Sequence, residues 1–322
     1  MTLARRRLGG GPLEVSELAL GSWRTLERQP RERAAAHLAP ALERGVTFLD
    51  EARYDDETGS APLASGYSEV VFGELVRAAP RPRAELVVSE KLWWQFWPAQ
   101  SAAAELEASL ARLRFEAVEL IYAVTLPPGL TVERAVEEIA GLLAAGRARA
   151  WGVANWSAAD LLAAAGACAA AGIDPPCAAQ LPYSVVERDW VEDPAMAHAL
   201  EADGCGLVAS AVLAGGALTG RYARERAHGR LAGRLADPAL AGALAAGERL
   251  AALAGELDTS ATALAVAFAL EHPRLASVLV GASAPAQLDD AIAGLELHAR
   301  LDAEQRARIR AAGGEPGDRR RR

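Results

Sequence analysis

The chain has 322 residues with 42 acidic and 34 basic side chains, which gives a formal net charge of −8. This negative balance argues against nucleic acid or a membrane surface as a partner, and a hydrophobic share of 51% excludes disorder over most of the chain. No apolar run reaches the roughly 18 residues of a membrane span, and the start, MTLARRRLGG, lacks the apolar segment of a secretory signal, so we expect a cytoplasmic protein.

Short apolar runs alternate along the chain with longer segments that suit amphipathic helices. The runs are typical of buried strands and cover residues 18–20, 46–49, 86–88, 118–124, 150–154, 177–181, 207–208 and 277–280. Helical segments lie between them, several with a capping Ser or Thr at the start, and include residues 101–113, 131–145, 157–171 and 285–295. Continuous apolar strands that each precede a helix predict a parallel sheet, and eight such units predict a closed (β/α)₈ TIM barrel.

Both ends of the chain depart from this alternation. Residues 5–17 contain three consecutive glycines and a proline, and predict an N-terminal β-hairpin that closes the floor of the barrel. Residues 313–322 are rich in glycine and end in four arginines, which is typical of a disordered basic tail. We therefore expect a single barrel domain over residues 1–312.

Three cysteines and two scarce residue types bear on the chemistry. Cys168, Cys177 and Cys205 lack the spacing of a metal site and stand in apolar stretches, so we expect buried thiols and no metal. Lys91 is the only lysine and Asn155 the only asparagine, in a chain whose other basic residues are all arginine. A lysine kept where arginine serves everywhere else indicates a position that needs a small ammonium group.

Polar residues follow most of the predicted strands, at the barrel end where such folds carry their chemistry. Both scarce residues belong to this set, which supports a functional lysine. The set comprises Asp50, Lys91, Asn155, Gln180, Ser210 and the turn Gly281-Ala282-Ser283.

Asp50 and Lys91 follow adjacent strands, so their carboxylate and ammonium can pair. Such an ammonium can lower the pKa of a nearby phenol, and Tyr54, four residues after Asp50, is the nearest candidate for a proton donor. Two other interpretations stay open on these residues alone: a purely structural salt bridge, and a Schiff base between the lysine and a carbonyl substrate.

Seven segments together resemble the aldo-keto reductases, most of all the group that contains the Shaker-type potassium-channel β subunits. The resemblance covers residues 6–308, and its motifs are LGSWRT (20–25), VTFLDEARY (46–54), SEVVFGELV (68–76), LVVSEK (86–91), WGVANWSAADL (151–161), LAGGALTGRY (213–222) and VGASAPAQLDD (280–290). It implies a barrel that binds NADPH and reduces aldehydes or ketones. Hydride then moves from the nicotinamide to the carbonyl carbon while a tyrosine protonates the oxygen.

The resemblance also implies roles for individual residues. Asp50 orients Lys91, Lys91 acidifies the tyrosine, and Arg221 lies near the cofactor phosphates. The full set implied to contact the cofactor is Gly21, Ser22 and Trp23 beside the nicotinamide, Asn155 and Gln180 at its carboxamide, Ser210 at the ring, Leu213, Gly215 and Arg221 in the LAGGALTGRY motif, and Gly281, Ser283, Gln287 and Asp290 at the adenosine end.

Several positions depart from the family pattern. Val124 stands where the family usually has histidine, and its side chain cannot donate a hydrogen bond. Ser210 replaces the aromatic platform under the nicotinamide. Tyr54 lies four residues after Asp50 where the family has five, before a longer loop, which makes Tyr67 a second candidate for the proton donor.

The segment LWWQFWP, residues 92–98, directly follows Lys91. Its aromatic side chains line either a pocket or a contact surface, or pack under a lid. Their place next to the lysine favours a wall for an apolar or aromatic carbonyl compound. The predicted substrate pocket comprises Trp23, Trp93, Trp94, Val124 and Trp156.

The sequence therefore predicts NADPH-dependent reduction of a small-molecule aldehyde or ketone by a modified catalytic set of Asp50, Tyr54 and Lys91. The alternative is a nicotinamide-binding sensor or regulatory barrel with little or no turnover. The turn after the eighth strand lacks the Lys or Arg that often contacts the 2′-phosphate of NADPH. Arginines in the long loop after the seventh strand either take this role or form a solvated basic loop, and an oligomer is left open. These arginines are Arg221, Arg224, Arg226, Arg230 and Arg234.

Overall fold

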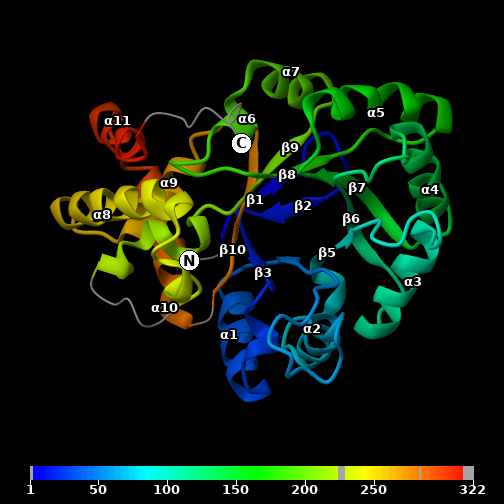
Figure 1. The fold of residues 1–322 in the computed structure, drawn as a ribbon, viewed down its shortest axis with the longest axis horizontal. Coiled ribbons are helices and arrows are strands. Elements are labelled where there is room, and N and C mark those ends of the chain that lie inside the picture. The colour runs from blue at the N-terminus through cyan, green and yellow to red at the C-terminus, as the bar shows by residue number, and fades with distance from the viewer. Residues whose placement is uncertain (1–2, 224–228, 283, 315–322) are drawn as a thin grey trace.

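The computed structural model describes residues 3–223, 229–282 and 284–314 of the chain. In this part of the chain, eight parallel strands close into a barrel in the order β10-β3-β4-β5-β6-β7-β8-β9 (Figure 1). The strands are β3 (Leu18–Gly21), β4 (Phe48–Asp50), β5 (Val87–Leu92), β6 (Val118–Val124), β7 (Ala148–Ala154), β8 (Ala178–Pro182), β9 (Gly206–Ser210) and β10 (Leu275–Val280). Each overlaps one of the predicted apolar runs, so the (β/α)₈ prediction is confirmed.

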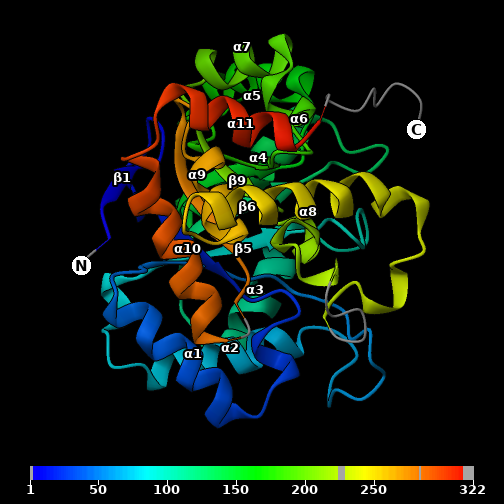
Figure 2. The same ribbon diagram turned by 90° about the vertical axis from the view of Figure 1, so that its left-hand side faces the viewer.

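Helices surround the barrel, and α11 packs outside this ring against α8 and α9 (Figure 2). The helices are α1 (Arg31–Glu43), α2 (Tyr67–Ala78), α3 (Ala102–Leu113), α4 (Val132–Ala144), α5 (Ala158–Ala171), α6 (Asp189–Glu192), α7 (Pro194–Ala202), α8 (Ala241–Glu256), α9 (Ala261–Ala269), α10 (Pro285–His298) and α11 (Ala303–Ala312). The capping side chains of Ser101, Thr131 and Ser157 each accept a backbone N–H three residues on, as their sequence positions predict.

No helix in the described ranges is by itself long and apolar enough to cross a membrane. Helices Pro238–Glu256 and Ala261–Ala269 meet that test only as a pair, and they are bent by 102° at their junction. The three cysteines are free and buried, as predicted.

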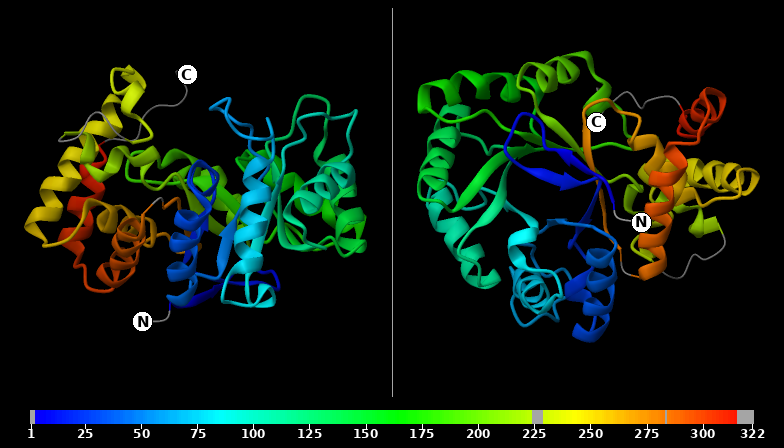
Figure 3. Two further views of the ribbon diagram at one scale, coloured as in Figure 1. Left: turned by 90° about the horizontal axis from the view of Figure 1, so that it is seen from below. Right: turned by 180° about the vertical axis from the view of Figure 1, so that it is seen from behind.

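An antiparallel hairpin of β1 (Arg5–Arg7) and β2 (Glu14–Ser16) lies across the amino-terminal end of the barrel, as predicted (Figure 3, right). Its turn buries Leu8 and Leu13 in an interior cluster that includes Phe48 from β4. Gly9 has φ +56°, and a Cβ there would lie 2.3 Å from the carbonyl oxygen of Cys177. Only glycine permits this close approach of the turn to the barrel wall.

The tail prediction concerns residues of which 315–322 lie outside the described ranges. Gly313 and Gly314 are described, and the carbonyl oxygen of Gly314 accepts a hydrogen bond of 2.9 Å from Arg188. The domain boundary at residue 312 stays a prediction.

The parallel register brings the carboxyl ends of the strands to one end of the barrel, opposite the hairpin. Asp50 is in register with Gly21 on one side and with Ser89 on the other. Lys91 lies one inward-facing position beyond Ser89 on β5. The side chains of Asp50 and Lys91 therefore meet just below this rim.

We expect Leu13→Ala to lower the free energy of unfolding by about 2–5 kcal/mol, because it opens a cavity under the barrel floor. Urea denaturation measures the change. Leu162→Ala, at a leucine of α5 that is 38% exposed, is the matched control and should shift stability by no more than about 0.5 kcal/mol. Equal losses in the two variants would show that the hairpin does not contribute to the core.

Candidate active site

A buried ion pair forms the centre of the barrel mouth. The Lys91 ammonium donates to Asp50 Oδ2 at 2.7 Å and to the backbone carbonyl of Glu51 at 3.2 Å. The other carboxylate oxygen of Asp50 accepts the Ser89 hydroxyl at 2.7 Å and the Gln180 amide at 3.0 Å. Since both carboxylate oxygens are engaged, the direction of the ammonium is fixed.

The ring of Tyr54 lies close to this pair. The Lys91 ammonium lies 6.0 Å from the centroid of the Tyr54 ring. Two tryptophan rings flank it, with centroids 6.3 Å away for Trp23 and 6.2 Å away for Trp93. The loop after β4 thus places a partly buried tyrosine among aromatic rings, above the ion pair.

Tyr67 lies elsewhere. It is the first residue of α2, its hydroxyl accepts a hydrogen bond of 3.2 Å from Arg31, and the same guanidinium lies 5.3 Å from its ring centroid. The two tyrosines therefore occupy different environments, and only Tyr54 contacts the neighbourhood of Lys91.

The acidity of Tyr54 differs from the expectation. Burial, followed by the charges of Asp50, Glu51 and Glu90, raises the pKa of its phenol well above the ordinary value. The charge of the Lys91 ammonium is compensated by Asp50, so the lysine does not reverse this effect. The phenol holds its proton in this arrangement, and the predicted lowering of its pKa is not found.

Four buried glutamates lie behind the catalytic strand ends, and sequence reasoning missed them. They are Glu51 beside β4, Glu90 on β5, Glu69 on α2 and Glu105 on α3, and burial raises the pKa of each carboxyl. Arg112 pairs with Glu69. A signal was present, because a glutamate next to Asp50 and another next to Lys91 must face the helices when the catalytic pair faces the barrel interior.

The predicted carboxamide residues lie on neighbouring strands. Asn155 is exposed just after β7, has φ +58°, and donates its backbone N–H to the Gln180 carbonyl at 3.1 Å. The Gln180 side chain is directed to Asp50. Ser210 closes β9 and pairs with Pro182 in the register. Asn155 is thus exposed at the end of β7, whereas the Gln180 amide is committed to the ion pair.

The residues that follow β3 also lie at this rim of the barrel. The backbone N–H and the hydroxyl of Ser22 both donate to the Asp50 carbonyl, at 3.0 and 3.1 Å. A Cβ at Gly21 would lie 3.2 Å from Leu279, so this close strand pair favours glycine. Trp23 is 45% exposed, between the guanidinium groups of Arg24 at 4.6 Å and Arg230 at 5.0 Å from its ring centroid.

The other predicted cofactor residues follow β9 and β10. Leu213 precedes the short turn Ala214–Thr219, in which Gly215 has φ +67°, and Arg221 begins the next turn with its guanidinium 5.6 Å from the Tyr222 ring. Gly281 follows β10, and Gln287 and Asp290 lie in α10. Ser283, Arg224 and Arg226 lie outside the described residues.

Arg230 lies between the segment after β3 and the segment after β10. Its guanidinium donates to the Trp23 carbonyl at 3.0 Å, and a Cβ at Gly281 would lie 3.8 Å from the same group. Burial lowers the pKa of this guanidinium. An exposed amide at Asn155 and guanidinium groups on the opposite side form a donor set that fits the carboxamide and phosphates of a nicotinamide dinucleotide.

The predicted pocket tryptophans separate into two groups. Trp23 and Trp93 lie at the mouth, whereas Trp94 and Trp156 are only 2% and 1% exposed and pack into the layer between strands and helices. The indole N–H of Trp156 donates to the Val124 carbonyl at 3.1 Å. Trp94 and Trp156 therefore support the wall from behind, because strand-end geometry turns them outward, and do not form its surface.

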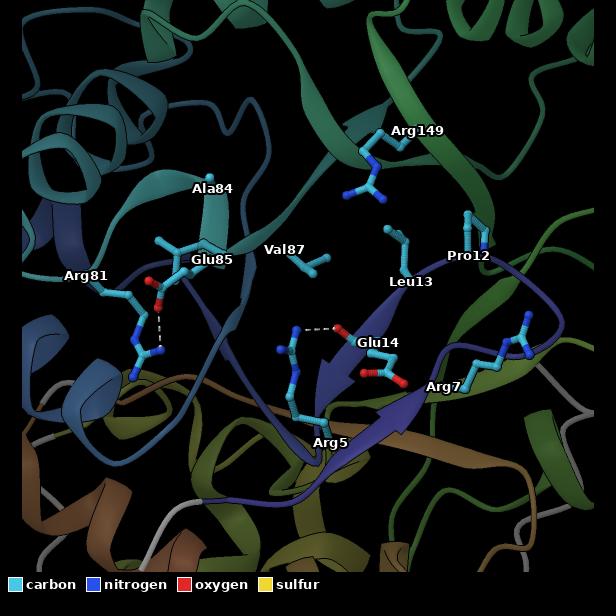
Figure 4. Close-up of a pocket in the computed structure, with 11 residues that line it drawn as sticks. Arg5, Arg7, Pro12, Leu13, Glu14, Arg81, Ala84, Glu85, Val87 and Arg149 are labelled. Carbon is cyan, nitrogen blue, oxygen red and sulfur yellow. Dashed lines mark hydrogen bonds and ion pairs between the residues drawn. The ribbon is translucent and has the colours of Figure 1, made fainter.

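A cavity of about 700 Å³ lies at the other end of the barrel, lined by residues of the hairpin and of the strand beginnings (Figure 4). Val87 opens β5 and Arg149 lies near the start of β7, which places this cavity at the floor. It does not include Asp50, Lys91 or Tyr54. The candidate site is therefore the mouth, where the titratable groups meet.

A model of the Aldo/keto reductase family matches residues 17–313. The match begins directly after the hairpin and includes all eight barrel strands together with Asp50, Tyr54 and Lys91. It does not divide the family, so the likeness to the channel β subunits stays a prediction. On this match, which covers most of its length, the chain belongs to the aldo/keto reductase family.

Proposed function

We propose that the protein reduces the carbonyl group of an aldehyde or ketone with NADPH, and that Tyr54 is the proton donor. Family membership supports oxidoreduction of carbonyl compounds. The observation that carries the proposal is the Asp50–Lys91 ion pair beneath the ring of Tyr54 at the carboxyl end of the barrel. Trp23 and Trp93 beside that ring favour an apolar or aromatic substrate.

The chain's own residues bind and orient the substrate and protonate its carbonyl oxygen. NADPH supplies the hydride that reaches the carbonyl carbon. The Tyr54 hydroxyl gives its proton to the carbonyl oxygen, and the Lys91 ammonium stabilises the phenolate that remains. Asp50 holds that ammonium in place, and the hydrogen bonds from Ser89 and Gln180 hold Asp50.

Val124 limits the rate in this proposal. An apolar side chain replaces a donor beside the developing oxyanion, which costs about 10²- to 10³-fold in rate. A positioned proton donor contributes about 10²- to 10⁴-fold. The retained Tyr54 therefore supports turnover that is slower than that of a complete catalytic set.

The preference for NADPH rests on guanidinium groups. Arg230 is exposed at the mouth, and its one hydrogen bond in the described structure, to the Trp23 carbonyl, leaves several donors for phosphate oxygens. Arg221 follows the Leu213–Gly215 turn and supports the same preference. Asn155 is the residue we assign to the carboxamide.

A nicotinamide-binding sensor with little turnover is the second candidate. Val124 favours it, because the missing donor weakens chemistry without weakening cofactor binding. The resemblance to the channel β subunits also supports a sensor. A lysine-based aldolase is disfavoured, because the Lys91 ammonium is committed to Asp50 and to the Glu51 carbonyl.

The main test is to mix the purified protein with NADPH and a panel of aromatic aldehydes, and to follow the nicotinamide absorbance. We expect slow consumption of NADPH that depends on the aldehyde. Tight binding of NADPH, measured by fluorescence titration, with no consumption across the panel would support the sensor instead.

Two tyrosine variants test the proton donor. We expect Tyr54→Phe to lower kcat by about 10²- to 10⁴-fold, because the general acid is removed while the ring is kept. Tyr67→Phe is the matched control and should retain kcat, since its hydroxyl bonds to Arg31. Loss of activity in the control alone would assign the proton to Tyr67.

Arg230→Gln tests the cofactor assignment. We expect the Kd for NADPH to rise about 10- to 100-fold, the equivalent of losing hydrogen bonds to a charged group, and the Kd for NADH to rise less. Arg33→Gln, at an exposed position of α1, is the control. Equal changes for the two cofactors would remove Arg230 from the phosphate site.

A further inference from the structure

The indole N–H of Trp93 is buried and has no hydrogen-bond partner among the described residues. A buried donor without an acceptor is unfavourable by about 1–3 kcal/mol, so such groups usually meet a ligand or water. The other unpartnered indole, that of Trp94, belongs to the layer between strands and helices. Trp93 alone of the two packs against the interior cluster that contains Val124.

Trp93 stands directly beside the proposed proton donor. Its ring meets the Tyr54 ring edge to face, with 6.2 Å between centroids and an angle of 68°. It follows the last residue of β5, at the rim of the mouth. A carbonyl oxygen that accepts the Tyr54 proton therefore lies beside the Trp93 ring.

The backbone of Trp93 is held from behind by a carboxylate. One oxygen of Glu105, on α3, accepts the Trp93 N–H at 2.8 Å, and the other accepts the Trp94 N–H at 3.1 Å. Glu105 is only 5% exposed. Trp94 has φ +58°, a conformation that side chains as large as tryptophan rarely adopt, and these two hydrogen bonds stabilise it.

Two charged groups on neighbouring segments act on Glu105. Glu69 on α2 repels its carboxylate, and Arg53 after β4 attracts it. Arg53 also donates to Gln95 and to the Ser65 hydroxyl, and so attaches the same loop from the other side. The loop that carries Trp93 is thus fixed at two points.

We propose that the Trp93 indole N–H donates a hydrogen bond to the substrate carbonyl oxygen and supplies the donor that Val124 lacks, with Glu105 as its positioning residue. The inference rests on the proposed reductase function. The expected substrates are carbonyl compounds whose oxygen can contact both Tyr54 and Trp93. During reduction the N–H keeps its proton, and the proton that bonds to oxygen comes from Tyr54.

Tyr122 is the competing donor in the barrel interior. Its hydroxyl is also buried without a partner in the described structure. It lies two residues before Val124 on β6, in register with Lys91, and is wholly unexposed, whereas Trp93 stands two residues beyond Lys91 at the rim. We therefore assign the substrate contact to Trp93, at the rim, and use Tyr122→Phe to test the alternative donor.

The experiment measures steady-state reduction of benzaldehyde with NADPH. We expect Trp93→Phe, which keeps an aromatic ring but removes the N–H, to lower kcat about 10- to 100-fold without changing the Kd for NADPH. Tyr122→Phe tests the competing donor and should lower kcat by a smaller factor than Trp93→Phe. Thermal unfolding confirms that each variant is folded.

Rescue separates a donor from a packing role. We expect Val124→His to raise kcat in the Trp93→Phe background by a larger factor than in the parent, because a new donor then replaces the lost one. Equal factors in the two backgrounds would overturn the proposal. An unchanged kcat in Trp93→Phe, or a larger loss in Tyr122→Phe, would overturn it as well.

Glu105 variants test the positioning role. We expect Glu105→Gln to lower kcat, since the amide can accept only one of the two backbone N–H groups, and Glu105→Asp to retain more activity than Glu105→Gln. Glu107→Gln, an exposed position of α3 that pairs with Arg147, is the control and should match the parent. Equal kcat values in all three variants would exclude the role of Glu105.

The parent protein separates the two levels of inference. Absence of benzaldehyde turnover by the parent overturns the reductase proposal and this inference together. Turnover by the parent that persists in Trp93→Phe overturns this inference only.

Discussion

The ion pair between Asp50 and Lys91 is the interaction on which the rest of the site depends. Burying two charges is favourable only when hydrogen bonds replace the lost water. Here β4 supplies the carboxylate, β5 the ammonium and a hydroxyl, and β8 an amide. If one of these strands is out of register, a buried charge loses its partner in an apolar interior. Such a loss lowers the free energy of unfolding by about 3–5 kcal/mol. The charge pair therefore also favours correct closure of the barrel.

The parts of the molecule that follow from local periodicity were predictable. A buried parallel strand appears in the sequence as a short apolar run. Helices α3, α4 and α5 begin directly after the capping residues Ser101, Thr131 and Ser157, which are also visible in the sequence. The proximity of Asp50 and Lys91 follows from the same regularity, because parallel strands that end at one rim bring their next residues together. The family resemblance then supplied roles that periodicity alone could not.

Properties set by loops and by side-chain direction were not predictable. The choice between Tyr54 and Tyr67 depends on the path of the loop after β4, which carries no periodic signal. Trp93 and Trp94 are adjacent in sequence, yet one faces the barrel mouth and the other the helical layer, because successive residues alternate. The pKa of Tyr54 is raised first by burial and then by the charges of Asp50, Glu51 and Glu90, and these effects are visible only when the path of the loop and the distances between strands are known.

The hairpin covers the floor of the barrel, opposite the mouth. Leu8 and Leu13 are buried with Phe48 in the amino-terminal end, below the ion pair. In the proposed reaction, the proton that Tyr54 gives up is then replaced from the side where Trp23 and Arg230 stand. A molecule that covers this rim therefore also controls when the Tyr54 phenolate is reprotonated. Reprotonation then requires that the mouth of the barrel be uncovered.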